Sequence, residues 1–303
     1  MDQIAAMRAF VRVVETGNFT RAATTLNIPK TTVTTLVQGL EQHLRTTLLN
    51  RTTRRVMVTN DGALYYERAM QILAELDELD SSLSSSQTQP SGRLRVEMAG
   101  AFADLIVVPA LCDFYQQYPQ IRLDIGVGDR LVDYIAENVD CALRAGTPGD
   151  QSLIARKVGE MAMVPCAAPS YIEQFGLPEN PEDLNGEHWA VGYLATQTGR
   201  VYPMEFRRGE ELREITPNYI VSVNDARSYV SAALAGMGVI QSPRFMVGEA
   251  LAKGELVRIL PEWSGESIPL YIVYPQTRHL SNKVRVFVDW LAKLIQSHRA
   301  AGL

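Results

Sequence analysis

Cysteine and histidine are scarce in this chain and do not cluster. The three cysteines, Cys112, Cys141 and Cys166, lie far apart, each in an apolar run, and the four histidines show no metal-ligand spacing. We therefore expect three buried free thiols, in preference to a disulfide or a redox switch. We expect no metal site and no cofactor.

Long apolar runs are also missing. No uninterrupted stretch reaches membrane-spanning length, and the start, Met1-Asp2-Gln3, lacks the basic-then-apolar layout of a signal peptide. We therefore expect a cytoplasmic protein that does not interact with membranes.

Motifs for catalysis are missing as well. The chain has no phosphate-loop pattern, no serine-nucleophile elbow and no HExxH metal motif. The run AGMGV at 235–239 follows a predicted helix and precedes a predicted strand, which reverses the order of the dinucleotide-binding fingerprint. Gly236 is therefore interpreted as a helix C-cap. No catalytic residue is assigned, and the sequence argues against an enzyme.

Charge, by contrast, is present in quantity but unevenly distributed. The 303 residues carry a net charge of −5, an unexpected value for a nucleic-acid binder. Residues 1–60, however, contain eight Lys/Arg and three acids, whereas the remainder contains 21 and 31. A small basic module attached to an acidic body is the pattern expected of a DNA-binding domain on a larger partner domain. The length is sufficient for two domains or more.

Residues 19–59 predict two short helices, a tight turn and a basic wing. Small and apolar residues recur on one face of 19–26, and Asn27-Ile28-Pro29 then breaks the helical pattern. A second helix is expected to begin near Lys30, with Pro29 in its first turn. Its buried stripe comprises Val33, Val37, Leu40 and Leu44. A preceding helix over 2–16 is expected to pack behind it through Ile4, Met7, Phe10, Val11 and Val14.

The other face of the second helix carries side chains able to donate hydrogen bonds, as a helix that reads base edges in the major groove requires. In the wing, Val56 and Val58 are expected to point inward while arginines at the tip contact phosphates or a minor groove. An idle, solvated turn is the alternative for the wing. Thr20 is the predicted N-cap of the first helix and a candidate phosphate contact. The predicted DNA-binding residues are Thr20, Arg21, Lys30, Thr31, Thr32, Thr34, Thr35, Gln38, Arg51, Arg54 and Arg55.

This stretch resembles the N-terminal winged helix-turn-helix of LysR-type transcriptional regulators. The resemblance rests on the opening MDQIAAMRAFVRVVETGNF, the pattern AA--L-I---TV--LV--LE--L and the arginine-rich wing that begins at Asn50. Four positions depart from the family: Thr34 and Thr35 stand where many members have Ser-Arg, Arg45 where Gly is usual, and Leu49 where Phe is usual. The resemblance implies a sequence-specific, DNA-binding transcriptional regulator.

A long helix is predicted over 61–85. Its apolar residues repeat with a 3.5-residue period over three heptads, which favours a coiled coil between two subunits. The alternative is an amphipathic helix docked on its own domain. The resemblance implies a dimer or a tetramer, and a dimer would present two reading helices to a two-fold symmetric site. The predicted seam comprises Tyr65, Ala69, Ile72, Leu76, Leu79 and Leu83. The polar run from Ser84 to Gly92 is interpreted as a hinge.

From Arg93 onward strands and helices alternate, which favours a parallel α/β sheet. Strands are expected at 94–98, 121–127, 141–144, 161–168, 189–193, 219–223, 239–242 and 270–274. Helices are expected at 104–118, 130–138, 225–235, 244–252 and 281–296. The segments VDCALRAG, VNDARSYVSAALAGMGVIQSPRF and LAKGELVRILPEW resemble the co-inducer domain of LysR-type regulators, which is similar to two-lobed type 2 periplasmic binding proteins.

The expected architecture is an α+β multidomain fold. A winged helix-turn-helix over 1–60 is followed by a dimerisation helix and hinge over 61–92 and an effector-binding domain over 93–303. Lobe I of that domain is expected at about 93–163 and 269–303, and lobe II at about 164–268.

An effector site is expected between the lobes, because open α/β sheets bind ligands beyond the carboxyl ends of strands, at helix N-termini. Strand ends at 100–102, 128–129, 193–198 and 224–225 satisfy this description. Simple capping of the helix over 225–235 is an equally good interpretation of Asn224 and Asp225. The candidate effector-binding residues are Gly100, Ala101, Phe102, Asp129, Tyr193, Thr196, Asn224 and Gln241.

The favoured hypothesis is a transcriptional regulator of double-stranded DNA whose activity is modulated by a small-molecule effector. An enzyme or transport-type binding protein with an accessory DNA-binding head is the first alternative. A ligand-independent architectural DNA binder is the second.

Overall fold

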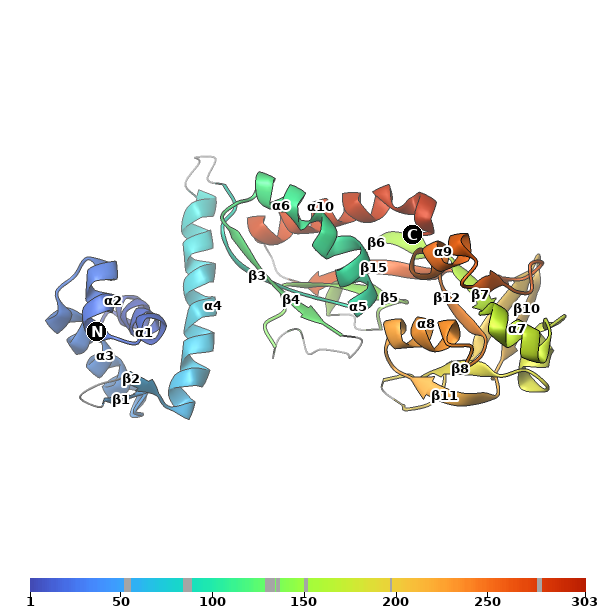
Figure 1. Ribbon diagram of the computed structural model, residues 1–303. Helices are drawn as coiled ribbons and strands as arrows, with labels where there is room; N and C mark the ends of the chain where they lie inside the picture. The colour runs from blue at the N-terminus through green and yellow to red at the C-terminus, as the bar shows by residue number, and fades with distance from the viewer. Residues whose placement is uncertain are drawn as a thin grey trace. The chain divides into compact units, whose positions relative to one another are not determined.

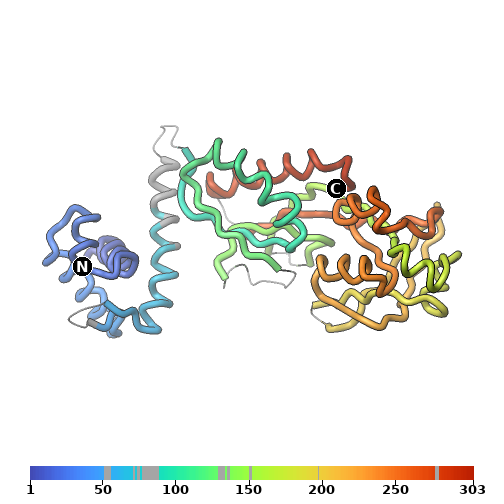
Figure 2. The backbone as a smooth tube through the Cα atoms, viewed as in Figure 1, coloured from blue at the N-terminus to red at the C-terminus, as the bar shows by residue number. Residues whose placement is uncertain are grey.

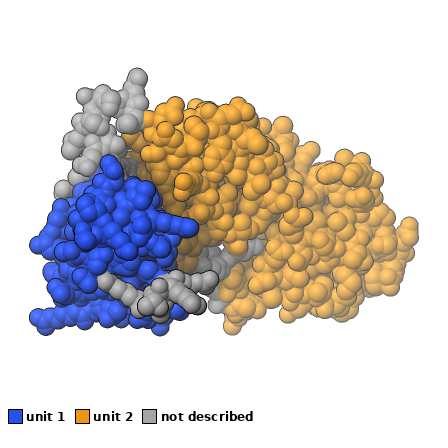
Figure 3. Space-filling model, turned by 60° about the vertical axis from the view of Figure 1, so that its left-hand side comes forward, with its two compact units in different colours: residues 1–88 blue, residues 89–303 orange. Residues whose placement is uncertain are grey.

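The chain divides into two compact units, residues 1–88 and 89–303, which Figure 3 draws in different colours. The computed structural model describes residues 1–51, 56–83, 89–128, 134, 137–149, 152–196, 198–276 and 280–303 (Figure 2). Unit 1 includes both the predicted DNA-binding head and the predicted linker helix.

Unit 1 is a winged helix-turn-helix followed by a long helix (Figure 1). Fully buried Phe10, Val37 and Leu40 belong to one core that α1 to α4 share. Its elements are α1 (Gln3–Thr16), α2 (Phe19–Leu26), α3 (Lys30–Leu44), β1 (Leu49–Arg51), β2 (Val56–Val58) and α4 (Asn60–Leu83).

Two details of this unit differ from the sequence predictions. Ile4 is 43% exposed, whereas the small side chains of Ala6 and Ala9 are buried in the shared core. Val58 is 38% exposed, so the predicted inward alternation of the wing strand fails at its last residue.

Asn18, and not Thr20, caps α2. The Asn18 side-chain oxygen accepts hydrogen bonds from the backbone amides of Thr20 at 2.7 Å and Arg21 at 3.3 Å. The helix begins at Phe19, so Thr20 already lies inside its first turn, where a side chain cannot serve as the cap.

The C-terminal end of α3 is closed by Arg45, one of the departures from the family pattern. Arg45 has φ 54°, and its amide donates to the carbonyls of Glu41 and Gln42. This left-handed conformation favours glycine, because a Cβ atom there crowds the following carbonyl. Glu41 then ties α3 to β1, since its Oε1 accepts from the amides of Leu48 and Leu49 at 2.9 and 3.0 Å.

The first half of α4 docks on its own domain, which is the alternative that the heptad pattern left open. The rings of Tyr65 and Phe10 meet edge to face with centroids 5.6 Å apart, and Ala69 and Leu73 are buried in the same core. Tyr65 and Ala69 therefore pack within unit 1, and because Ala69 is buried there its place in an intersubunit seam is corrected. Ile72 is 49% exposed. The side chains of Leu79 and Leu83 lie outside the described set.

Lobe I of unit 2 is built on a five-stranded sheet of order β4-β3-β5-β15-β6. The first three strands are parallel, but β15 runs antiparallel to both β5 and β6, so the sheet is mixed and the parallel prediction is corrected. The strands are β3 (Gly92–Met98), β4 (Ile121–Val127), β5 (Cys141–Ala145), β6 (Leu153–Met161) and β15 (Ile268–Pro275).

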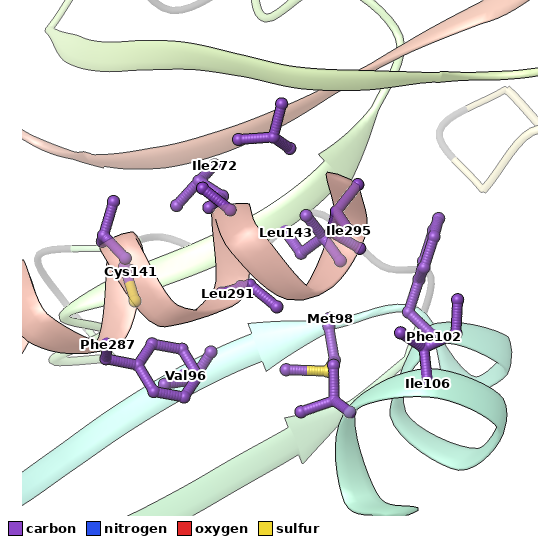
Figure 4. Packing of buried hydrophobic residues seen from close by; sticks show 14 of the residues in the cluster. Val96, Met98, Phe102, Ile106, Cys141, Leu143, Ile272, Phe287, Leu291 and Ile295 are labelled. Carbon is purple, nitrogen blue, oxygen red and sulfur yellow. The ribbon is translucent and has the colours of Figure 1, made fainter. Parts of the chain in front are cut away.

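Helices cover one face of this sheet and form the largest hydrophobic core with it (Figure 4). The predicted helix over 104–118 begins earlier, at Gly100, and continues through a π-helical turn: α5 (Gly100–Phe102), the turn (Ala103–Val107) and α6 (Val108–Gln117). Val96 and Met98 of β3 face Phe287 and Leu291 of α10 (Asn282–Ser297) across this core. The helix predicted over 130–138 lies almost entirely outside the described residues.

Lobe II contains three small sheets, of order β12-β7-β13, β11-β8 and β10-β9-β14. Its predicted helices appear as α8 (Ala226–Leu234) and α9 (Arg244–Lys253), together with the unpredicted α7 (Pro169–Phe175). Gly236, with φ 77°, follows Ala235, the C-cap of α8, which confirms that it lies at the helix end. The strands are β7 (Met163–Ala167), β8 (Ala190–Tyr193), β9 (Met204–Arg208), β10 (Glu211–Ile215), β11 (Tyr219–Val223), β12 (Ile240–Pro243), β13 (Val257–Arg258) and β14 (Ser264–Gly265).

Candidate nucleic-acid interface and effector cleft

The two faces of α3 differ completely in burial. Val33, Val37 and Leu40 are fully buried on one side, while Thr31, Thr35 and Gln38 are exposed on the other. A helix held this way projects its polar face outward from the domain and can enter a major groove.

Hydrogen bonding divides the threonines of this face. Thr34 donates its hydroxyl proton to the carbonyl oxygen of Lys30, and Thr35 donates its own to that of Thr31; the oxygen–oxygen distance is 3.0 Å in both bonds. In this structure the hydroxyl protons of these two residues are therefore used within the helix. Lys30, Thr31, Thr32 and Gln38 remain available as donors.

A hollow of about 410 Å³ lies where α2 and α3 meet. Pro29 is the N-cap of α3 and provides no side-chain hydrogen bond, so the first amides of this helix are not capped by a side chain. Exposed backbone amides at a helix N-terminus, next to the Lys30 ammonium, suit a phosphate group. The hollow is lined by Thr20, Ala23, Thr24, Asn27, Ile28, Pro29 and Lys30.

The wing is described only at its base. β1 and β2 pair antiparallel, with Arg51 opposite Val56. Arg54 and Arg55, the predicted phosphate contacts at the tip, lie outside the described residues, as does the side chain of Arg51.

In unit 2, several of the predicted strand ends lie close together. Tyr193 and Val223 are paired across β8 and β11, which places Asn224 beside Tyr193. The α5 helix packs on α8, so the Gly100 segment of lobe I meets the N-terminus of α8 in lobe II. Asp104 and Arg227 form an ion pair at this junction. Sequence reasoning missed this pair, and no local signal could have revealed it, because the two residues lie 123 positions apart.

Asp225 caps α8 and leaves Asn224 free. The Asp225 carboxylate accepts from the Ser228 amide at 2.8 Å and from its hydroxyl at 2.7 Å, and these bonds hold the pKa of Asp225 below its usual range. Asn224 is exposed and makes no side-chain hydrogen bond with a described residue. Asn224 and Asp225 were each predicted either to cap the helix or to bind an effector. The capping interpretation is confirmed for Asp225.

Three of the predicted effector contacts, Ala101, Phe102 and Gln241, contact other parts of unit 2. Phe102 is buried and stacks on Phe245 with ring centroids 5.1 Å apart, and Ala101 is buried beside it. Gln241 donates its side-chain amide to the carbonyl of Glu205 at 2.8 Å, which joins β12 to β9. Gly100, Tyr193 and Thr196 remain candidates, whereas Asp129 lies outside the described residues.

The cysteines differ in environment. Cys141 and Cys166 are buried, and burial raises the pKa of the Cys166 thiol to about 12 and that of Cys141 further. Cys112 is exposed on α6, so the expectation of three buried thiols is wrong at that position. Among the described residues, no cluster of His, Cys, Asp and Glu could hold a metal ion, and no described helix is long and apolar enough to cross a membrane.

Each of the two units matches a model of a known protein family. The family model described as "Bacterial regulatory helix-turn-helix protein, lysR family" matches residues 4–63, and the one described as "LysR substrate binding domain" matches residues 87–296. The fold and the matches define a DNA-binding transcriptional regulator with an effector-binding regulatory domain. The chain belongs to the LysR-type transcriptional regulators, a non-enzymatic family.

Individual relatives match over almost the whole chain. YhjC, an uncharacterised HTH-type transcriptional regulator of Escherichia coli strain K12, is 39% identical to this chain. The matched region covers 98% of this chain and 99% of YhjC. An HTH-type transcriptional repressor of Pseudomonas aeruginosa strain UCBPP-PA14 is 35% identical, covering 97% and 92%. The solved structure of CrgA, a LysR-type transcriptional regulator from Neisseria meningitidis, is 30% identical with a TM-score of 0.60, covering 96% and 98%.

Proposed function

We propose that α3 is the recognition helix of this regulator and reads base edges through Lys30, Thr31, Thr32 and Gln38. The observation that carries this proposal is the contrast between the fully buried stripe of α3 and its exposed polar face. Lysine can donate to guanine O6 and N7, glutamine can form two hydrogen bonds with adenine, and a threonine hydroxyl can serve as donor or acceptor.

Phosphate contacts orient this helix in the groove. Thr20, Arg21 and Lys30 lie at the hollow between α2 and α3 or beside it, where a backbone phosphate would meet uncapped amides and positive charge. Arg51, Arg54 and Arg55, which follow the proposed recognition helix in the sequence, supply further contacts. The +5 balance of residues 1–60 supports this assignment.

The effector binds between the lobes of unit 2, near Gly100, Tyr193, Thr196 and Asn224. Gly100 comes from the lobe that carries Asp104, and Tyr193, Thr196 and Asn224 come from the lobe that carries Arg227, its partner in the ion pair. An effector alters regulation only if it binds one arrangement of the protein better than another. Asp129 follows β4 and belongs to the same proposed site by its position in the sequence.

The working form is a homodimer, or a tetramer made of dimers, acting on DNA in the cytoplasm. Ile72 is exposed on α4 and Leu76 is half-buried, and Leu79 and Leu83 continue the same spacing in the sequence. An apolar stripe of this kind requires a partner surface. Pairing through it would present two copies of α3 to a two-fold symmetric site.

The proposal is tested by footprinting the purified full-length protein on DNA fragments selected from genomic DNA. We expect a protected site with two-fold related halves. Salt-sensitive binding without a preferred site would favour an architectural DNA binder, and no binding at low salt would contradict the proposal. Arg54→Ala with Arg55→Ala should weaken binding to all sequences, whereas Thr31→Ala or Thr32→Ala should change the preference among sequences.

A further inference from the structure

The reading face of α3 carries four threonines, and hydrogen bonding divides them into two pairs. Thr34 and Thr35 have committed their hydroxyl protons to backbone carbonyl oxygens. Thr31 and Thr32 make no side-chain hydrogen bond with a described residue. Residues of one type on one surface are therefore chemically unequal.

Position within the helix explains this division. α3 begins at Lys30, so the residues four positions before Thr31 and Thr32 precede the helix. Thr34 and Thr35 lie one turn further along, where the carbonyl four residues back is within reach of a hydroxyl. Threonines one turn into α2 behave in the same way, since Thr24 and Thr25 donate to carbonyls four residues earlier.

A committed hydroxyl changes what a threonine can read. The hydroxyl has one proton, so while Thr35 donates it to the Thr31 carbonyl no donor is left for a base acceptor such as guanine O6 or N7. What remains distinctive on its exposed surface is the γ-methyl group. In the major groove the matching apolar feature is the C5-methyl group of thymine, which Thr methyls are able to contact.

We propose that α3 reads DNA through two chemistries, with Thr31 and Thr32 donating hydrogen bonds and Thr35 packing its methyl group against a thymine C5-methyl. Half-buried Thr34 lies at the edge of this contact and contributes less. The inference rests on the proposed role of α3 as the recognition helix. The inference predicts that the DNA site contains a thymine at a fixed position, and that the protein recognises this thymine without a hydrogen bond.

The test compares matched variants on a duplex isolated from a random pool by repeated selection with the full-length protein. Thr35→Val keeps the methyl and removes the hydroxyl, and we expect its affinity to stay within about twofold of the parent, because the hydroxyl is not needed. Thr35→Ser keeps the hydroxyl and removes the methyl, and should bind about fourfold more weakly, the equivalent of one buried methyl group. Thr31→Val should bind about tenfold more weakly, since a base acceptor loses its donor.

Replacing single thymines of the duplex by deoxyuridine removes the C5-methyl and nothing else. The parent and Thr35→Val should each lose about fourfold in affinity at the same thymine, whereas Thr35→Ser should bind both duplexes equally well. Thermal unfolding midpoints that match the parent establish that the variants are folded.

Two results would overturn the inference while leaving the recognition helix in place. One is a loss for Thr35→Val as large as that for Thr31→Val, which would show that the Thr35 hydroxyl donates. The other is indifference of the parent to deoxyuridine at every thymine. If Thr31→Val and Thr35→Ser both leave specific binding unchanged, the assignment of α3 itself is wrong.

Discussion

The two units of this regulator assemble their proposed functional surfaces in opposite ways. In unit 1 the reading face comes from one continuous segment, so helix periodicity alone separates buried Val33 and Val37 from exposed Thr31 and Gln38. In unit 2 the junction between the lobes joins Asp104 to Arg227, which lie far apart in the chain. The exposed face of α3 can be predicted from the local spacing of residues, whereas the junction between the lobes can be identified only from the tertiary fold.

The largest expected effect tests whether each unit has its own core. Phe10 is fully buried in the core of unit 1, so Phe10→Ala should destabilise that unit by about 3–5 kcal/mol. DNA binding should be lost while the denaturant transition of unit 2 is unchanged. Urea unfolding of the full chain, followed by circular dichroism and by DNA binding, measures both.

Phe287→Ala is the matched control, because Phe287 is fully buried in the core of lobe I. It should destabilise unit 2 by a similar amount and leave unit 1 folded. If either substitution shifts the urea unfolding transitions of both units equally, the two units unfold as one, which would contradict the prediction that each unit has its own core.

A smaller effect is expected at the hydrogen bonds that connect the wing to α3. Glu41→Ala removes the acceptor for the buried amides of Leu48 and Leu49 and should cost about 3 kcal/mol, the sum of two bonds to a charged group. Gln42→Ala, an exposed neighbour on the same helix, is the control and should change stability by less than about 0.5 kcal/mol. Equal effects of the two substitutions would refute the structural role of Glu41.

Arg45→Gly should stabilise unit 1 by about 0.5–1 kcal/mol. Glycine relieves the left-handed strain at φ 54°, worth about 1–2 kcal/mol, and part of this gain is offset by the greater freedom of the unfolded chain. Thermal unfolding measures the shift. Arg45→Ala removes the same charge but keeps the Cβ atom, so a similar gain in that variant would assign the effect to charge.

The smallest effect on stability is expected at the ion pair between the lobes. Asp104 and Arg227 are both substantially exposed, so Arg227→Ala should cost less than about 1 kcal/mol in urea unfolding. Because the pair joins the two lobes, its loss should increase hydrogen exchange at the N-termini of α5 and α8. Unchanged exchange there would show that the pair does not hold the lobes together.

The sequence predicted the elements of unit 1 well because local signals are strong there. Pro29 marks the start of α3, and the four-three-four spacing of its apolar residues identifies the buried face. Its failures involve competition between neighbouring groups. Asn18 takes the cap that was assigned to Thr20, and the carbonyls of Lys30 and Thr31 take the protons of Thr34 and Thr35.

In unit 2 the strands with clear alternation were found, whereas contacts between distant segments were not. β4 matches its predicted bounds, but β6 was missed because charged Arg156, Lys157 and Glu160 interrupt its apolar pattern. Gln241 was assigned to an effector, yet its amide is used by the carbonyl of Glu205 on another sheet. Such hydrogen bonds depend on how the sheets pack against each other, and the local spacing of residues in the sequence does not indicate them.

The salt dependence of DNA binding tests the central claim, the division of unit 1 into a base-reading helix and surrounding phosphate contacts. Affinity for the selected duplex would be measured from low to high salt for the parent, Thr31→Ala and Arg21→Ala. Arg21→Ala should reduce the log–log slope by about one unit and weaken binding to all sequences, whereas Thr31→Ala should keep the slope and change the preferred sequence. An unchanged slope for Arg21→Ala together with an unchanged preference for Thr31→Ala would contradict the account.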